Sequence, residues 1–233
     1  MLQWLGKSSP FPPLDQALTE PNGLLAAVAD LSPARLIDAY RRGIFPWYNE
    51  NDPILWWSPQ PRLVLFPEEL KISRSLGKSI RKRHYEVRLD TSFEEVMKKC
   101  AEPREEGGGT WISAQIIEAY CRLHELGLAH SAETWVEGEL AGGLYGINMG
   151  QVFFGESMFS RRTDASKIAF VHLVLQLKSW GCRMIDCQVK TQHLASLGAR
   201  EISREEFALK LKTWLDAPGH SGKWHFDHDL IEC

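Results

Sequence analysis

The spacing of apolar positions predicts short strands and helices that alternate along the chain after residue 62. Apolar runs or alternating patterns typical of strands cover residues 63–66, 85–89, 130–136, 139–149, 151–159 and 183–189. Helical spacing covers residues 73–83, 93–100, 114–126, 165–180 and 192–197. Glu137-Gly138 joins two of the strands, which predicts a β-hairpin there.

The first sixty residues lack this regularity and are dense in proline and tryptophan. One clear helix is predicted from Ser32-Pro33 to Gly43, because serine caps a helix and proline suits its first turn. The segments 45–47 and 56–59 are rich in turn residues. Because the composition changes near Arg62, we predict a domain boundary there, dividing the chain into residues 1–62 and 63–233.

The order of elements in the second half is hairpin, strand, helix, strand, helix, which resembles the GCN5-related N-acyltransferase fold. In that fold, users of acyl-coenzyme A carry spaced glycines after the third strand, and their N–H groups bind pyrophosphate at a helix N-terminus. Here the corresponding residues, 160–167, contain no glycine. This argues against coenzyme A as the donor.

Composition narrows the class of protein. The 233 residues are 44% hydrophobic and 24% charged, which is typical of a folded chain of one or two domains. A net charge of -3 does not exclude an RNA partner, because an average hides local patches. Five cysteines without a CxxC pair argue against a disulfide framework or zinc knuckle, and the eight histidines form no ligand set, so we expect no metal. No apolar stretch approaches the ~20 residues that span a bilayer, so we expect a cytoplasmic protein.

The helix predicted at residues 73–83 is strongly basic. Its cationic residues are Arg74, Lys78, Arg81, Lys82 and Arg83. Positions 74, 78, 81 and 82 recur at spacings of three or four, so they lie near one another on a helix. Such a cluster attracts phosphates. The alternative is an ordinary solvated helix face.

Two predicted strands carry the most suggestive polar residues. Alternation places Asp186 and Gln188 on one face of their strand and Cys187 on the other. A carboxylate beside an amide can orient it to accept a hydrogen bond from an incoming amine, although a buried structural pair is the alternative. Alternation also places Glu156 and Met158 on one face, where the glutamate could pair with a basic group or bond to a neighbouring loop.

Several segments together point to one family. They are Pro21-Asn22-Gly23-Leu24-Leu25, Asp30-Leu31-Ser32-Pro33, Arg42-Gly43-Ile44-Phe45-Pro46-Trp47, Pro53-Ile54-Leu55-Trp56-Trp57-Ser58-Pro59, Thr110-Trp111-Ile112, Gly142-Gly143-Leu144-Tyr145-Gly146, Gly155-Glu156-Ser157-Met158-Phe159-Ser160, Ile185-Asp186-Cys187-Gln188 and His193-Leu194-Ala195-Ser196-Leu197-Gly198. In this order and spacing, the chain resembles the leucyl/phenylalanyl-tRNA–protein transferases over nearly its whole length. It departs from them in the long run of glycines at 107–109 and in the tail after Trp214.

The resemblance implies an α+β fold, in which a small N-terminal α/β domain packs on a GCN5-related N-acyltransferase-like domain. It implies transfer of leucine or phenylalanine, and less readily methionine, from aminoacyl-tRNA to proteins that begin with Lys or Arg. The modified proteins would be marked for degradation through the N-end rule pathway. No cofactor, membrane or DNA is implied.

The resemblance also assigns site residues. Asp186 and Gln188 match the reaction centre, where they either take part in proton transfer or only position substrate while a tRNA ribose hydroxyl relays the proton. We add Glu156 to this catalytic set, because its carboxylate could pair with the basic side chain or the amine of the acceptor. Trp47 and Trp111 match tryptophans at the terminal adenosine of the tRNA, a base that stacking can recognise. The apolar aminoacyl pocket would be formed by Leu144, Met158, Phe170, Leu173 and Leu177. Ordinary core packing is the alternative for the last three.

Two other classes of protein are alternatives to an aminoacyltransferase. A small-molecule N-acyltransferase using coenzyme A conflicts with the glycine-free loop at 160–167. A non-catalytic RNA-binding or adaptor protein would have no need of Asp186, Gln188 and Glu156 in their motifs.

Overall fold

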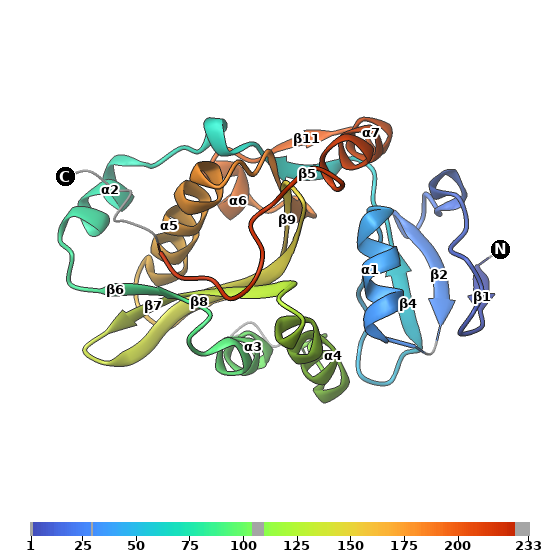
Figure 1. The fold of residues 1–233 in the computed structure, drawn as a ribbon, viewed down its shortest axis with the longest axis horizontal. Helices are drawn as coiled ribbons and strands as arrows, with labels where there is room; N and C mark the ends of the chain where they lie inside the picture. Colours follow the sequence, from blue (N-terminus) through green and yellow to red (C-terminus); the bar gives the residue numbers. More distant parts are fainter. Residues whose placement is uncertain (1, 29, 104–109, 227–233) are drawn as a thin grey trace.

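The computed structural model describes residues 2–28, 30–103 and 110–226, in which the strands form two sheets flanked by helices (Figure 1). The glycine run at 107–109 lies outside these residues. The observed architecture is α+β, as predicted, with a small N-terminal unit beside a larger one. Within the described residues, no helix combines the length and apolar character that crossing a membrane requires.

The N-terminal part is a four-stranded sheet covered by one helix (Figure 1). Its strand order is β1 (Gln3–Leu5), β2 (Leu24–Val28), β4 (Ile54–Trp57) and β3 (Phe45–Pro46). The predicted helix is confirmed as α1 (Pro33–Arg41), and the Ser32 side chain accepts a hydrogen bond from the Arg35 backbone N–H.

The turn-rich reading of segments 45–47 and 56–59 was wrong in part. Phe45 and Pro46 form β3, and Trp56 and Trp57 belong to β4, which pairs with both β2 and β3. The core explains the difference, because Trp56 is fully buried and packs edge-on against Phe11. These strands are too short to show a period in the sequence.

The second sheet has seven strands in the order β11-β5-β10-β9-β8-β7-β6. The bounds are β5 (Arg62–Leu65), β6 (Glu86–Leu89), β7 (Ala129–Val136), β8 (Glu139–Met149), β9 (Val152–Ser160), β10 (Met184–Gln188) and β11 (Arg200–Ile202). β9 and β10 are parallel, and the other neighbouring pairs of this sheet are antiparallel. The domain boundary near Arg62 remains a prediction, at the place where one sheet ends and the other begins.

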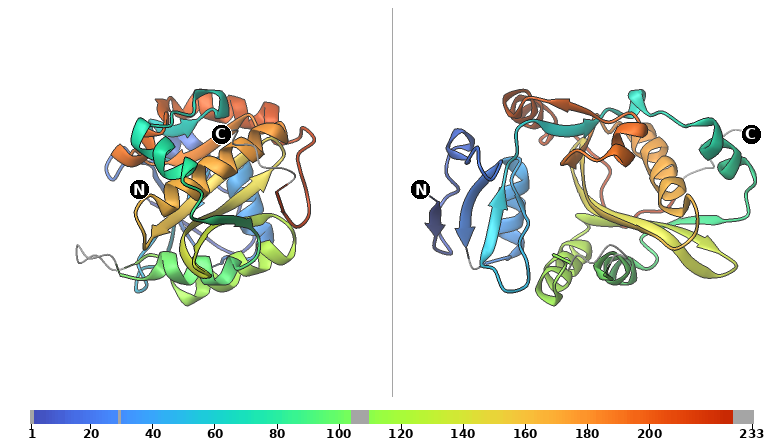
Figure 2. Two further views of the ribbon diagram at one scale, coloured as in Figure 1. Left: turned by 90° about the vertical axis from the view of Figure 1, so that its left-hand side faces the viewer. Right: turned by 180° about the vertical axis from the view of Figure 1, so that it is seen from behind.

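Helices cover both faces of this sheet (Figures 1 and 2). One face of the sheet is covered by α2 (Arg74–Arg81), α5 (Ala165–Ser179) and α6 (Gln192–Ser196). The other face is covered by α3 (Phe93–Ala101) and α4 (Ala114–Glu125). These helices and the strands β5 to β10 agree with the predicted elements to within two residues. No prediction covered β11 or α7 (Arg204–Trp214).

The sheet opens between β9 and β10. Their parallel pairing joins residues 152–154 to 184–186 and then stops, although both strands continue. Two irregularities accompany this separation. The register of β10 against β5 shifts between Asp186 and Gln188, and that of β9 against β8 shifts beside Gly155. Residues after these points therefore leave the simple alternation of a flat sheet.

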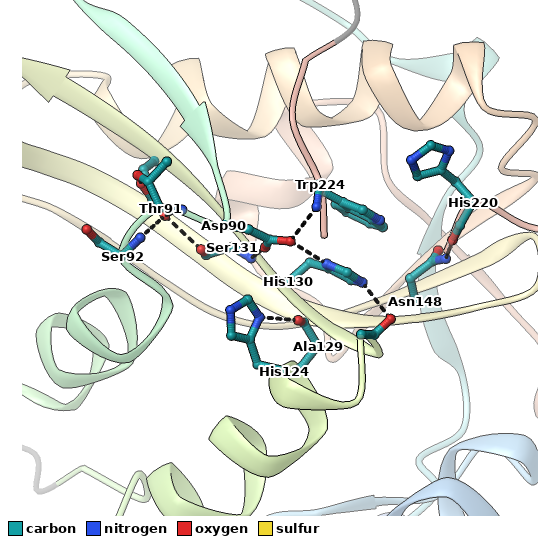
Figure 3. A network of polar contacts seen from close by, with 12 residues as sticks. Asp90, Thr91, Ser92, His124, Ala129, His130, Ser131, Asn148, His220 and Trp224 are labelled. Carbon is teal, nitrogen blue, oxygen red and sulfur yellow. Dashed lines mark hydrogen bonds and ion pairs between the residues drawn. The ribbon is translucent and has the colours of Figure 1, made fainter. Parts of the chain in front are cut away.

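The segment after α7 is part of the core, although the sequence offered no reading of it (Figure 3). Trp224 is 1% exposed, and its ring stacks on His130 with centroids 3.7 Å apart. The buried Asp90 carboxylate accepts hydrogen bonds from the Trp224 backbone N–H and from His130 Nδ1, both at 2.8 Å. The C-terminal segment thus packs on β7 beside the end of β6, and Trp224 belongs to the apolar cluster on the α5 side of the sheet.

Candidate functional site

Asp186 lies on β10 and is fixed by an arginine on the neighbouring strand. Its Oδ1 accepts from Arg62 Nε at 2.8 Å and its Oδ2 accepts from Arg62 Nη2 at 2.6 Å. Oδ1 also accepts from the backbone N–H of Gln188 at 2.9 Å. Both side chains are fully buried. The carboxylate is therefore occupied by protein partners on both oxygens, and it does not orient the Gln188 side-chain amide directly, contrary to the expectation.

Gln188 is placed by the irregular end of β10. Its backbone has φ 60°, a left-handed conformation that is uncommon outside glycine. The predicted division of faces is confirmed, because Cys187 packs on the α5 side of the sheet while Gln188 turns to the other side. There its Nε2 donates to Glu156 Oε1 at 2.9 Å. It is Glu156 that orients the Gln188 amide.

Glu156 is held by two tyrosines from different parts of the chain. Tyr40 of α1 contacts its Oε1 at 2.7 Å, and Tyr120 of α4 contacts its Oε2 at 3.2 Å. The two hydroxyls also contact each other at 2.5 Å. The predicted common face of Glu156 and Met158 is wrong, since Met158 packs with the α5 cluster. The register shift beside Gly155 is the reason.

Counting protons in this triangle favours a neutral Glu156. Three oxygen–oxygen contacts join the carboxyl group and the hydroxyls of Tyr40 and Tyr120. With an ionised carboxylate only the two phenol protons are available, so one contact would lack a hydrogen. A proton on Glu156 supplies the third, and each contact then has one donor and one acceptor.

The electrostatic surroundings agree with this count. Burial of the carboxyl group, the main cause, raises the pKa of Glu156 to about 8, even though part of the residue remains exposed. Asp186 raises it further, whereas the tyrosine hydroxyls and Arg62 oppose the shift. Burial also raises the pKa of Tyr40 and of Tyr120 well above 10, so both phenols keep their protons.

Four of the five residues predicted for the aminoacyl pocket are closed within the core. Leu144, Phe170, Leu173 and Leu177 are at most 3% exposed and pack between the sheet and α5. Met158 lies at the same cluster but is partly exposed. It pairs with Leu144 across β8 and β9, beyond the point where β9 leaves β10. The pocket role of all five stays a prediction.

Trp47 and Trp111 come from the two parts of the chain and lie on neighbouring segments. Trp47 is 44% exposed and packs against Trp57 with ring centroids 5.4 Å apart. Trp111 is partly buried. Burial raises the pKa of Tyr48, and the hydroxyl of Ser113 beside it opposes the shift. The hydroxyl groups of Tyr48 and Ser113, one and two residues after the tryptophans, are thus close to each other, and the adenosine role of Trp47 and Trp111 stays a prediction.

The basic helix presents its charges to solvent. Leu76 and Ile80 anchor α2 in the core, while the predicted phosphate contacts Arg74, Lys78, Arg81, Lys82 and Arg83 are all exposed. Ser79 donates a hydrogen bond to Asp164, which ties α2 to the start of α5. The structure therefore brings the cluster to one surface, although nothing in it tests whether the cluster binds phosphate.

Sequence reasoning missed three residues that shape the site. Arg62 stands at the start of a buried strand, and Tyr40 and Tyr120 stand on the buried faces of helices. Each fits an ordinary structural pattern in the sequence, so no local signal marks them. Their partners lie far along the chain, at a sequence separation of 124 for Arg62 and Asp186 and of 116 for Tyr40 and Glu156.

The β9–α5–β10 unit, with polar side chains converging where its two strands part, defines an α+β protein of the acyltransferase type. Comparison with known sequences gives the particular family. A family model described as leucyl/phenylalanyl-tRNA protein transferase matches residues 64–212, and the model of the N-terminal domain of the same family matches residues 29–60. The chain belongs to the leucyl/phenylalanyl-tRNA protein transferase family and is an enzyme of the aminoacyltransferase class.

Relatives match over the full chain. The leucyl/phenylalanyl-tRNA–protein transferase of Nitrosospira multiformis is 63% identical and covers 100% of both chains. That of Nitrosomonas europaea is 62% identical and covers 97% of this chain and 96% of its own. Solved structures align more distantly. L-PGS from Bacillus licheniformis has a TM-score of 0.40 at 13% identity, over 81% of this chain and 65% of that one. A GCN5-related N-acetyltransferase from Kribbella flavida has a TM-score of 0.38 at 9% identity, over 73% and 61%.

Proposed function

We propose that the protein transfers leucine or phenylalanine, and less readily methionine, from aminoacyl-tRNA to the N-terminus of proteins that begin with Lys or Arg. The products enter N-end rule degradation in the cytoplasm. The observation that carries the proposal is the convergence of Glu156 and Gln188 where β9 and β10 separate, with Asp186 fixed behind them. Family membership supports the reaction class.

The chemistry requires positioning more than a nucleophile. An aminoacyl ester is already activated, so the α-amine of the acceptor can attack its carbonyl directly. The C–N bond forms, the ester C–O bond breaks, the amine loses a proton and the ribose oxygen gains one. The Nε2 of Gln188 donates a hydrogen bond to Glu156. The Oε1 of Gln188 is therefore left to accept a hydrogen bond from the incoming amine.

The acceptor is recognised by Glu156 rather than by Asp186. Asp186 is fully buried and its charge is already paired with the cationic Arg62, whereas Tyr40, Tyr120 and Gln188, which contact Glu156, are uncharged. Glu156 is partly exposed, and its carboxyl group lies beside Gln188. A basic N-terminal residue that approaches Glu156 favours its ionised form and gains an ion pair when the proton leaves.

The donor is held by its tRNA end and body. Trp47 and Trp111 stack on the terminal adenosine, which all charged tRNAs share, and the partly exposed Met158 contacts the aminoacyl side chain. The basic residues of α2 contact phosphates of the tRNA body. Coenzyme A fits the helix α5 poorly, because the carboxylate of Asp164 stands at its N-cap, where a pyrophosphate would bind.

The test is transfer of labelled leucine from Leu-tRNA to four peptides that differ only in the first residue, Arg, Lys, Asp or Gly. We expect labelling of the Arg and Lys peptides alone. Equal labelling of all four would remove the acceptor specificity while leaving acyl transfer intact. No labelling of any peptide, with Phe-tRNA also inactive, would remove the proposed function.

A further inference from the structure

We propose that Arg62 is a positioning residue for aminoacyl transfer, acting through Asp186 to hold the amide of Gln188 beside Glu156. This inference rests on the function proposed above. Arg62 belongs to none of the motifs that carry the family resemblance, and it acts without itself facing the substrate.

The guanidinium of Arg62 lies over aromatic rings from two other parts of the chain. Arg62 begins β5 and is fully buried. Its guanidinium carbon lies 4.7 Å from the ring centre of Phe45 in β3 and 4.6 Å from that of Phe207 in α7. The N-terminal sheet and the C-terminal helix therefore both set the orientation of this one planar group.

The orientation passes to Gln188 through Asp186. The fork of Arg62 holds both oxygens of Asp186, which fixes the rotation of the carboxylate. The Oδ1 of Asp186 in turn accepts a hydrogen bond from the backbone N–H of Gln188 at 2.9 Å. That bond supports Gln188 in its left-handed backbone conformation, from which the side chain reaches Glu156. Without it, an ordinary extended strand would turn the amide elsewhere.

The buried ion pair of Arg62 and Asp186 is not an efficient way to stabilise the core. Replacing a buried ion pair by apolar residues is often neutral or stabilising, because the charges lose their hydration. Within the described residues, Nη1 of Arg62 is moreover buried without a hydrogen-bond partner, which adds a further cost. A positioning role explains why a costly planar cation stands here. Its charge also opposes the rise in the pKa of Glu156.

The test compares Arg62→Lys with a matched loss of another buried arginine, Arg35→Lys. Arg35 is 7% exposed, donates to the backbone carbonyls of residues 6, 7 and 9, and lies over Phe11, away from the site. Lysine keeps the charge but cannot form the fork. Below the melting temperature of both variants, we expect Arg62→Lys to lower kcat about 100-fold with little change in either KM. Arg35→Lys should lower Tm and leave kcat within about twofold of wild type.

A second readout does not depend on turnover. The side-chain NH2 group of Gln188 is followed in ¹⁵N NMR spectra, where its resonance is assigned as the one that Gln188→Glu removes. We expect this resonance to shift in Arg62→Lys and to keep its position in Arg35→Lys. An unchanged resonance together with a kcat that falls equally in both variants overturns the proposal. Absence of transfer by the wild-type enzyme would instead refute the proposed function, and the resonance would then still show whether Arg62 positions the Gln188 amide.

Discussion

Replacing Glu156 by glutamine tests the neutral state that the tyrosine triangle implies. A glutamine amide can donate to one hydroxyl and accept from the other, so it mimics the protonated acid and not the carboxylate. The pKa of Glu156 is raised from 4.5 to about 8 in the folded protein, chiefly by burial. The folded state therefore binds this proton more tightly than the unfolded state does.

This difference in proton binding makes the stability of the wild-type protein depend on pH. Below about pH 4.5 both states are protonated, and the residue contributes no dependence. Between 4.5 and 8 the unfolded state releases the proton first, so wild-type stability falls as pH rises, and above 8 the full penalty persists. At ~1.4 kcal/mol per pH unit the upper limit is ~5 kcal/mol, and the partial exposure of Glu156 reduces our expectation to roughly 2–4 kcal/mol.

The assay is urea unfolding at pH 5, 7 and 9, analysed by linear extrapolation. We expect wild type and Glu156→Gln to be similar at pH 5, and the variant to be more stable by roughly 2–4 kcal/mol at pH 9. Glu139→Gln, the same change at an exposed position of β8, controls for the general effect of removing a carboxylate. A constant difference across the pH range, or a wild type that gains on the variant as pH rises, refutes the proton count.

Three further substitutions test other parts of the molecule. Trp111→Ala should raise KM for Leu-tRNA and Phe-tRNA alike by about tenfold or more, because stacking on a base contributes roughly 1–3 kcal/mol; an effect on one donor alone would place Trp111 in the aminoacyl pocket. Alanine at Lys78, Arg81 and Lys82 together should weaken binding of whole charged tRNA and flatten its salt dependence, while turnover of aminoacyl-adenosine stays the same. Equal loss with both donors would indicate damage to the fold. Trp224→Ala should lower the free energy of unfolding by roughly 3–5 kcal/mol in urea titration, whereas alanine at the exposed tryptophan of β1 should change it little; equal effects would contradict a core role for the C-terminal segment.

The sequence by itself determined the elements whose reasons are local. Ser32 and Pro33 mark the start of α1 because capping and the fixed backbone of proline act within one turn. The hairpin at Glu137-Gly138 and the bounds of β8 follow from a period of two and a turn that needs left-handed residues, both of which have positive φ. The motifs, taken in order, identified the family because spacing along the chain needs no coordinates.

Only the tertiary structure decided which polar groups meet. Asp186 was expected to orient the side-chain amide of Gln188, but its carboxylate forms a bidentate ion pair with Arg62. The amide is oriented by Glu156. Met158 and Glu156 lie on opposite faces of the sheet, because a register shift in β9 breaks the alternation that the sequence suggests. Trp224 joins the core through Asp90, 134 residues away. Contacts at such separations are set by how sheets and helices pack, and no pattern within a single segment records them.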